Sequence, residues 1–446
     1  MNTQTKHIAI IGAGLVGSLL SIYLSRRGYR VSVFERRDDL RKDVRQQGRS
    51  INLALSARGI RALEEVGLAA EVRKLAVPMH GRMMHDRKGT LTFQPYGRQG
   101  QYINSISRAG LNGMLISKAE ENNVRFFFNR RCTAVDLAGT SASFQSASGD
   151  LQTQTFDVVV GADGAFSAVR SAMQVTDRFD YSQEYLQHGY KELHIPAGKS
   201  GDHVMEKNAL HIWPRESYMM IALPNTDGSF TCTLFFPFEG DLSFASLTDD
   251  DRIISFFKEV FPDALPLLAA LTEEFNRNPT GSLVTVRCFP WVRNQTLLIG
   301  DAAHAIVPFY GQGMNAGFED CRMLNVLLDQ YAGNWPQALG TFQQMRKRDC
   351  DAISHLAYDN FVEMRDLVAD PGFLLRKKIE AKIHELYPEK WIPLYSMVTF
   401  HDDISYWQAY TTGKKQEKIM DAVMSQPQIS SRWQQLDFDK IVKELD

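Results

Sequence analysis

The chain has 446 residues, about three times the usual length of one domain, so we expect two or three lobes that each bury a core. The 50 lysine and arginine residues nearly balance the 52 aspartate and glutamate residues, which leaves a net charge of -2 and no basic field for nucleic acid or an acidic membrane. The five cysteines are widely spaced without a C-x-x-C pair, which argues against a disulfide or zinc framework and predicts reduced thiols in the cytoplasm.

Neither end of the chain resembles a targeting or membrane segment. The sequence MNTQTKH leads directly into an apolar strand, without the charged and apolar regions of a signal peptide. No run of about eighteen apolar residues occurs, and the C-terminal sequence LDFDKIVKELD is charged and amphipathic. We therefore expect a soluble protein without a membrane anchor.

The first elements predict a strand, a helix and a second strand. Residues 7–12 (HIAIIG) form an unbroken apolar run, the following segment has apolar residues at helical spacing, and YRVSVFER is apolar again. Unbroken apolar runs are typical of parallel strands that are covered on both faces. Helical periodicity also marks residues 56–75 and 107–122, and short strands and a loop are expected between them.

The sequence pattern changes twice in the second half of the chain. Residues 157–161 (DVVVG) and 293–300 (RNQTLLIG) predict two more buried strands. Between them, from about residue 179 to 286, short β-like runs alternate with turn sequences, which indicates a separate sheet. From residue 317 onward, long helical stretches dominate. We find no internal repeat, so a solenoid is not expected.

A glycine-rich turn joins the first strand to the first helix. Gly12, Gly14 and Gly17 match the pattern G-x-G-x-x-G, and Glu35 closes the next strand. In this arrangement, the first glycine makes a tight turn, the second lets the backbone approach a pyrophosphate, and the third lets the helix pack on the strand. The helix N-terminus stabilises the anion and the acid accepts hydrogen bonds from a ribose. The context predicts nucleotide binding rather than a turn alone.

Two further strand ends present glycine and aspartate. Asp163 lies in GADG after the strand at 157–161, and Asp301 lies in GDAAH after the strand at 293–300. An aspartate in such a place is often only a helix cap. Ligands of parallel sheets bind beyond the carboxyl ends of the strands, so we expect the three turns to line one crevice.

Together, these segments resemble a known family. GAGLVG with its acidic strand end, GADG, and GDAAH followed by PFYGQGMN resemble the FAD-dependent single-component aromatic hydroxylases. Finer matches, among them RGRSINLALS, ALHIWPR, VPFYGQGMNAGFEDC and IPLYSMVTF, are similar to the members that act on L-kynurenine. The resemblance extends from Ile8 to about Phe400.

The resemblance implies a monooxygenase reaction in tryptophan degradation. NADPH would reduce FAD, O2 would add to the reduced flavin as a C4a-hydroperoxide, and L-kynurenine would be hydroxylated to 3-hydroxykynurenine. The residues agree in one respect, since a single G-x-G-x-x-G predicts one resident nucleotide and a visiting reductant. No catalytic side chain is expected, because the flavin performs the chemistry and the protein excludes water.

The resemblance also implies which residues bind FAD besides the three glycines and Asp163. The adenosine and pyrophosphate would contact Val16, Glu35, Arg36, Arg37, Ala54 and Arg108. Asp301 would contact the ribityl chain, and Met314 and Asn315 the isoalloxazine. The last pair has a physical reason, because the loop GQGMN opens a helix whose free amides would face the negative charge of reduced flavin.

For L-kynurenine, the resemblance places a bidentate donor to the carboxylate at Arg82, assisted by Tyr96 and Tyr395. Asn360 would hold another polar end of the substrate. The apolar wall would consist of Leu210, Met219, Ile221, Phe235, Pro308, Phe309 and Met364. From the sequence alone, each wall residue is equally typical of an ordinary core.

The predicted fold class is α/β with an α+β insertion. A discontinuous Rossmann-like FAD-binding domain would surround a β-rich substrate domain and precede a helical C-terminal region. We assign residues 1–75, 107–178 and 291–320 to the FAD-binding domain, 76–106 and 179–290 to the substrate domain, and 321–446 to the helical region. The C-terminal helices also suggest a homodimer interface.

Two other functions stay open. The same flavin chemistry could act on another aromatic acid such as a salicylate or a hydroxybenzoate, and a flavin-binding redox sensor would bind FAD without turnover. His80 and His85 miss the spacing of a helical metal pair, so no metal is predicted.

Overall fold

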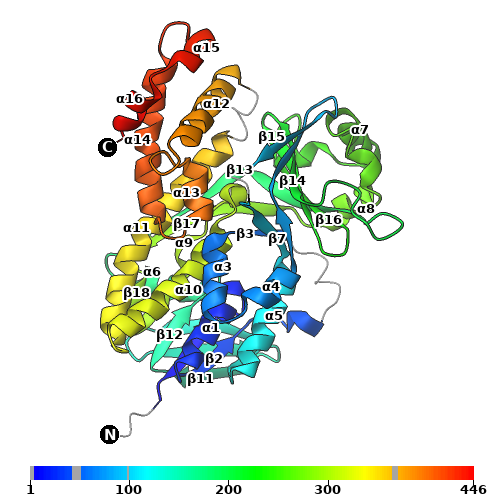
Figure 1. Ribbon diagram of the computed structural model, residues 1–446. Coiled ribbons are helices and arrows are strands. Elements are labelled where there is room, and N and C mark those ends of the chain that lie inside the picture. Colours follow the sequence, from blue (N-terminus) through cyan, green and yellow to red (C-terminus); the bar gives the residue numbers. More distant parts are fainter. Residues whose placement is uncertain (1–4, 43–51, 98–99, 364–369, 446) are drawn as a thin grey trace.

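The computed structural model describes residues 5–42, 52–97, 100–363 and 370–445. Figure 1 shows three regions. The lower part holds the N-terminal sheet and helix α1 (Leu15–Arg26), the right-hand part holds green strands with two short helices, and yellow-to-red helices rise on the left.

The N-terminal region is built on a six-stranded, mostly parallel sheet, which confirms the predicted α/β class. Its order is β18-β19-β12-β1-β2-β8. The strands are β1 (His7–Ile11), β2 (Arg30–Phe34), β8 (Arg125–Phe127), β12 (Val158–Gly161), β18 (Val292–Arg293) and β19 (Thr296–Leu298). Strands β1 and β12 are buried because helices and loops cover both faces, as the apolar runs predict. Segments that are far apart in sequence thus form one sheet.

Two local predictions were wrong in detail. The helical stretch at 56–75 is two helices, α3 (Ala57–Glu65) and α4 (Ala69–Lys74), because Gly67 adopts a positive φ of 68° and ends the first helix. The strand predicted at 293–300 is a hairpin, in which Val292 pairs antiparallel with Leu297. Asn294, with φ 51°, makes the turn that a strand pattern does not show.

Two small sheets complete the N-terminal region. One has the order β3-β7-β4 and the other β11-β10-β9. Their strands are β3 (Asn52–Leu55), β4 (Ala76–Met79), β7 (Ile103–Ser107), β9 (Arg130–Asp136), β10 (Ser141–Ser146) and β11 (Leu151–Thr155). Helices α5 (Arg108–Glu121) and α6 (Ala168–Gln174) follow β7 and β12. Within residues 76–106, β7 therefore pairs with β3, from the first FAD segment, and β4 pairs with β7, so neither strand joins the substrate sheet.

A seven-stranded sheet of order β17-β13-β16-β15-β14-β5-β6 extends from beside the C-terminal helices to the right-hand side of Figure 1. The strands are β5 (Gly81–His85), β6 (Leu91–Pro95), β13 (Asp180–Ile195), β14 (Ala209–Arg215), β15 (Tyr218–Pro224), β16 (Phe230–Pro237) and β17 (Gly281–Phe289). Helices α7 (Asp250–Val260) and α8 (Leu271–Arg277) cover one face of it and were not predicted.

The described residues that follow β19 are mostly helical. The helices are α9 (Asp301–His304), α10 (Gly313–Gln330), α11 (Trp335–Val362), α12 (Pro371–Leu386), α13 (Leu394–Phe400), α14 (Tyr406–Met424), α15 (Ile429–Arg432) and α16 (Phe438–Lys443). The boundary assigned at 320/321 falls inside α10, whose residues Phe318 and Leu324 belong to the N-terminal core. A helix cannot be divided there, so this lobe extends at least to Gln330. Within the described ranges, none of the helices combines the length and apolar character that a membrane crossing needs.

Candidate functional site

The glycine turn has the geometry that a dinucleotide needs. Gly12 has a φ of 106°, and a Cβ atom there would lie 2.4 Å from the Ala162 carbonyl oxygen. A Cβ on Gly17 would lie 2.0 Å from the Gly12 carbonyl oxygen, so helix α1 packs directly on the turn. Gly14, by contrast, faces open space, and a Cβ there would meet no atom within 4 Å. Gly12 and Gly17 thus serve the fold, and Gly14 leaves room for a ligand.

Glu35 lies against this turn at the end of β2. Its carboxylate accepts hydrogen bonds from the Ala13 amide at 3.0 Å and from the amide and Nε of Arg37, both at 3.0 Å. Burial acts to raise the pKa of Glu35, but the hydrogen bonds and the charge of Arg37 outweigh it, so the pKa lies below its usual value. Glu35 is therefore an ionised acceptor beside the glycine turn, as a ribose-binding acid must be.

The first turns of helix α10 pack beside the glycine turn, since a Cβ atom on Gly317 would lie 2.5 Å from the Val16 side chain. Its first intrahelical hydrogen bond runs from the Ala316 amide to the Gln312 carbonyl, so the amides of residues 313–315 are left over by the helix. The Asn315 side chain accepts from the Ser56 amide at 3.0 Å and donates to the Ala54 carbonyl at 2.8 Å. The Asn315 side chain thus holds β3 against α10, and only its backbone amide is left for an anionic ring.

Asp163 and Asp301 differ in their surroundings. Oδ2 of Asp163 accepts from the amides of Ala168 and Val169, at 2.7 and 3.3 Å, so the residue caps α6. Its other oxygen is buried without a hydrogen-bond partner, and burial raises the pKa of this carboxyl group. Asp301 is the first residue of α9 and is exposed. An unpaired buried oxygen beside the crevice fits a ligand that donates to it.

The other predicted FAD residues differ in exposure. Arg36, Arg37 and Arg108 are exposed, whereas Met314 is half-buried against the N-terminal core. Val16 is also half-buried, and its methyl groups would lie 3.1 Å from a Cβ on Gly300, so the turns after β1 and β19 lie in contact. The turn after β12 joins them, because Gly12 lies against Ala162. The structure thus brings the three strand-end turns together, as predicted.

Four of the predicted wall residues lie on one face of the seven-stranded sheet: Leu210, Met219, Ile221 and Phe235. Arg82 is the direct neighbour of Leu210 across β5 and β14, and Met219 is the direct neighbour of Phe235 across β15 and β16. Ile221 shares the face of Met219, because side chains two apart on a strand point to the same side. The opposite face carries Trp213, Met220, Ala222, Leu234 and Phe236, which pack in a core with α7 and α8. Half of each alternating strand is therefore ordinary core, and the other half packs toward the loop before α10.

Arg82 forms a cluster with two tyrosines. Its guanidinium carbon lies 4.8 Å from the ring centroid of Tyr395, on α13, and 5.6 Å from that of Tyr96, which follows β6. The rings of Tyr96 and Tyr395 stack at 5.6 Å. The Tyr96 hydroxyl is buried and has no hydrogen-bond partner. A cation and an unpaired donor thus meet at one place, which is what a buried carboxylate requires.

The loop before α10 closes the wall. Phe309 lies between Phe235 and Phe361, with ring centroids at 5.0 and 4.5 Å. Asn360 donates to the Phe309 carbonyl at 2.7 Å, so its amide holds the loop. Pro308 is exposed. Met364, the last predicted wall residue, lies outside the described residues.

Sequence reasoning assigned no role to two residues that belong to this site. The ring of Tyr310 stacks on that of Tyr395 at 5.6 Å and extends the tyrosine cluster. Arg58, on α3, is only 2% exposed and contacts the segment after α13. A signal for Arg58 exists, since it lies four residues before the fully buried Ala62, on the face that a helix turns inward.

A group of possible metal ligands, His304, Asp320 and Cys350, has its ligand atoms within 4.8 Å of one another. Nε2 of His304 lies 2.6 Å from one oxygen of Asp320, and Nε of Arg346 lies 2.7 Å from the other. Asp320 is therefore already paired with two nitrogen groups, one of them a permanent cation. The absence of a metal stays a prediction.

Known proteins resemble this chain in sequence and in fold. Residues 5–348 match a family model described as an FAD binding domain. A relative from Cytophaga hutchinsonii, named kynurenine 3-monooxygenase, is 50% identical over 432 residues, which is 96% of this chain and 96% of the relative. The chain belongs to the kynurenine 3-monooxygenase family. Members with the same name from Myxococcus xanthus and Dictyostelium discoideum are 50% and 43% identical, and cover 93% and 94% of this chain and 89% and 93% of their own lengths.

Solved structures share the fold at lower identity. A tetrameric form of 2-methyl-3-hydroxypyridine-5-carboxylic acid oxygenase is 21% identical, with a TM-score of 0.67, and covers 83% of this chain and 95% of its own. PqsL of P. aeruginosa in complex with 2-aminobenzoylacetate is 22% identical, with a TM-score of 0.65, and covers 81% and 97%. The match to the FAD binding domain model, together with this shared fold, confirms the FAD-binding architecture predicted from the sequence.

Proposed function

We propose that the protein hydroxylates L-kynurenine to 3-hydroxykynurenine, with FAD as the resident cofactor and NADPH and O2 as co-substrates. In the balanced reaction, L-kynurenine, NADPH, one proton and O2 yield 3-hydroxykynurenine, NADP⁺ and water. The observation that carries the proposal is the cluster of Arg82, Tyr96 and Tyr395, which contacts the ring of Tyr310 just before residues 311–315, here called the flavin loop. The names of the relatives support the same substrate.

The chain's own residues would bind and orient the substrate. Arg82 would pair with the carboxylate of the amino acid, and the unpaired Tyr96 hydroxyl would donate to it as well. The aromatic ring would lie along Met219, Ile221 and Phe235, which are apolar and therefore keep water out. Because L-kynurenine is a small zwitterion, a few placed groups suffice, and the net charge of -2 supplies no general field for it.

The residues around the crevice would hold FAD. Glu35 would accept from the ribose, Gly14 leaves room for the pyrophosphate, and the free amides of residues 313–315 would stabilise negative charge on the ring system. When bound, FAD takes electrons from NADPH and activates O2 for transfer to the substrate. The protein then has three tasks: to bind the two molecules side by side, to exclude water and to shield the activated oxygen.

We also propose that the protein works in the cytoplasm. All five cysteine thiols are free and buried, which fits a reducing compartment.

A panel of aromatic acids tests the substrate. The purified protein is given NADPH and L-kynurenine, a salicylate or a hydroxybenzoate, and NADPH oxidation, H2O2 and hydroxylated product are counted separately. We expect L-kynurenine to stimulate oxidation and to yield many equivalents of product per enzyme. Stimulation by another acid alone would favour the other hydroxylase function, and FAD binding without turnover would favour the redox sensor.

A further inference from the structure

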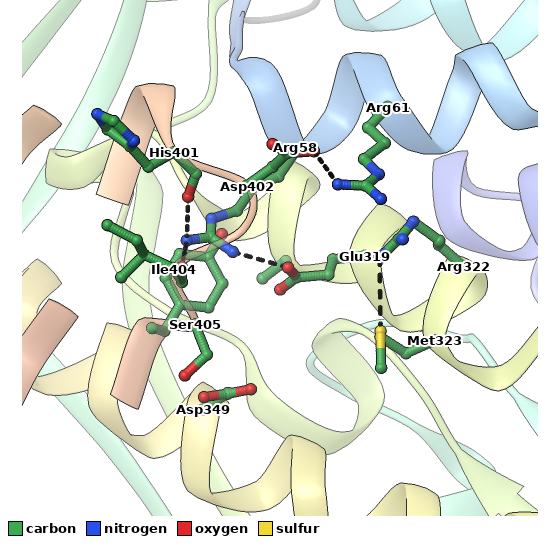
Figure 2. Close-up of polar contacts among 12 residues, drawn as sticks. Arg58, Arg61, Glu319, Arg322, Met323, Asp349, His401, Asp402, Ile404 and Ser405 are labelled. Carbon is green, nitrogen blue, oxygen red and sulfur yellow. Dashed lines mark hydrogen bonds and ion pairs between the residues drawn. The ribbon is translucent and has the colours of Figure 1, made fainter. Parts of the chain in front are cut away.

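Arg58 is a buried cation with an unusual set of partners. It lies on α3, and Figure 2 shows its side chain reaching from that helix toward the segment around His401 and Ile404. Its Nε donates to the Val398 carbonyl at 3.1 Å, and its Nη2 donates to the carbonyls of His401, at 3.0 Å, and Ile404. All three acceptors are backbone oxygens at or just after the C-terminal end of α13.

These bonds fix the end of a helix that belongs to the substrate site. The last carbonyls of a helix have no intrahelical partner, and a cation there is favourable because it faces the negative end of the helix dipole. Helix α13 carries Tyr395, whose ring contacts Arg82 and stacks between Tyr96 and Tyr310. The position of the Tyr395 ring therefore depends on how α13 is held.

The opposite side of the Arg58 guanidinium contacts α10, the helix that begins at the flavin loop. Its Nη1 donates to Glu319, on α10, at 2.7 Å, as Figure 2 shows. Glu319 is held in turn by Arg346 at 2.7 Å. The ring of Tyr406, at the start of α14, lies 4.1 Å from the Arg58 guanidinium carbon, and its hydroxyl donates to the Gln312 side chain at 3.0 Å. Arg58 thus lies between the substrate helix α13 and the helix that starts at the flavin loop.

We propose that Arg58 is a positioning residue, which sets the place of Tyr395 beside Arg82 relative to the helix that begins at the flavin loop. The inference rests on the proposed function, because Arg82 and Tyr395 are there taken to bind the substrate. It adds a residue that touches neither substrate nor cofactor and that acts through the backbone of α13. Arginine is required, since its planar group offers donors in three directions, whereas lysine offers a single point of charge.

The same chain provides a matched control. Arg61 lies one turn further along α3 and reaches Asp402, in the same segment, at 2.7 Å. Its side chain is 43% exposed, and it contacts a side chain, not the end of α13. Exposed ion pairs contribute little to stability or geometry. Arg61→Lys should therefore leave the substrate site unchanged.

The test is a double-mutant cycle between positions 58 and 395. Arg58→Lys, Tyr395→Leu and the double variant are prepared as FAD-loaded proteins, and the dissociation constant for L-kynurenine is measured without NADPH. FAD content and the share of NADPH electrons lost to H2O2 are recorded as well. If Arg58 acts through Tyr395, the effects of the two substitutions are not additive.

We expect Arg58→Lys to weaken L-kynurenine binding at least tenfold in the parent protein and less than threefold in the Tyr395→Leu background. FAD content should stay unchanged, and the H2O2 share should rise. An equal loss in both backgrounds, or no loss in the parent protein, would overturn the inference. If Arg58→Lys does not fold, Glu319→Gln enters the same cycle, and the same two results decide. If the parent protein binds no L-kynurenine, the proposed function fails instead.

Discussion

The guanidinium of Arg82, on β5, lies over the ring of Tyr395, on α13, with 4.8 Å between its central carbon and the ring centroid. The strand belongs to the seven-stranded sheet and the helix to the C-terminal region. This contact therefore joins two of the three regions of the molecule. It also defines the end of the site at which we place the carboxylate of the substrate.

Arg82→Ala should weaken L-kynurenine binding strongly and leave FAD content unchanged. A hydrogen bond to a charged group contributes about 1.5–3 kcal/mol, which is a factor of about ten to a hundred in affinity. The measurement is a binding titration of the FAD-loaded protein. Arg87→Ala is the control, because Arg87 is 66% exposed and pairs with an exposed glutamate, Glu216, at 3.0 Å. Equal affinity of the two variants would contradict the role of Arg82.

Tyr96→Phe separates ligand binding from stability. The Tyr96 hydroxyl is buried without a partner, so its removal should leave the melting temperature of the ligand-free protein unchanged or higher. If the hydroxyl donates to the substrate, the same substitution should weaken L-kynurenine binding about tenfold, the value of one hydrogen bond of about 1.4 kcal/mol. A lower melting temperature together with normal binding would show that the hydroxyl serves the fold.

Two alanine substitutions in the glycine turn should separate stability from FAD affinity. Gly17→Ala places a Cβ atom 2.0 Å from the Gly12 carbonyl oxygen, and we expect it to destabilise even the FAD-free protein by about 3 kcal/mol or more. Gly14→Ala meets no atom within 4 Å, so the FAD-free protein should keep its melting temperature while FAD affinity falls. The measurements are thermal unfolding of the FAD-free proteins and FAD titration. A destabilised Gly14→Ala variant would argue against open space for a ligand at Gly14.

His211 should make the protein sensitive to acid. Burial lowers the pKa of His211 from its ordinary 6.5 to about 4, while its ring nitrogens contact His85, at 2.9 Å, and the Glu206 carbonyl, at 2.8 Å. The unfolded chain takes up this proton near pH 6.5 and the folded chain only near pH 4. The contribution of neutral His211 to the free energy of unfolding is therefore fully present above pH 6.5. It falls by about 3 kcal/mol as the pH drops to 4.

His211→Gln should remove much of this acid sensitivity. Thermal unfolding is measured at pH 7.5 and 4.5, and the drop in melting temperature between the two values should be smaller for the variant than for the parent protein. An equal drop in both proteins would mean that other groups carry the acid sensitivity.

The predictions from sequence succeeded where the signal was local. The turn from β1 to α1 is one continuous segment, so glycine spacing and apolar periodicity determine it together. Glu35 was found for the same reason. By contrast, the hairpin of β18 and β19 depends on a positive φ at Asn294. The presence of a non-glycine residue in the sequence does not by itself predict a positive φ.

Local sequence patterns do not predict contacts between segments that are distant in the chain. Helix α7 was missed inside a β-rich stretch, although Asp249 caps it by accepting from the Arg252 amide at 3.0 Å. Arg82 and Tyr395 meet only in the folded chain, and the resemblance to a family, not their spacing, indicated them. Arg58 was missed because an arginine in an amphipathic helix is usually exposed. Only the fold shows that its partners are backbone carbonyls of a distant helix.

The central claim is that the protein transfers one oxygen atom from O2 to L-kynurenine. The most direct measurement is a reaction with ¹⁸O2, NADPH and L-kynurenine, in which the product is identified by mass and by the position of its new hydroxyl group. The account predicts 3-hydroxykynurenine that carries one ¹⁸O atom in that group. Unlabelled product, or NADPH oxidation that yields only H2O2 with every preparation of the FAD-loaded protein, would contradict it.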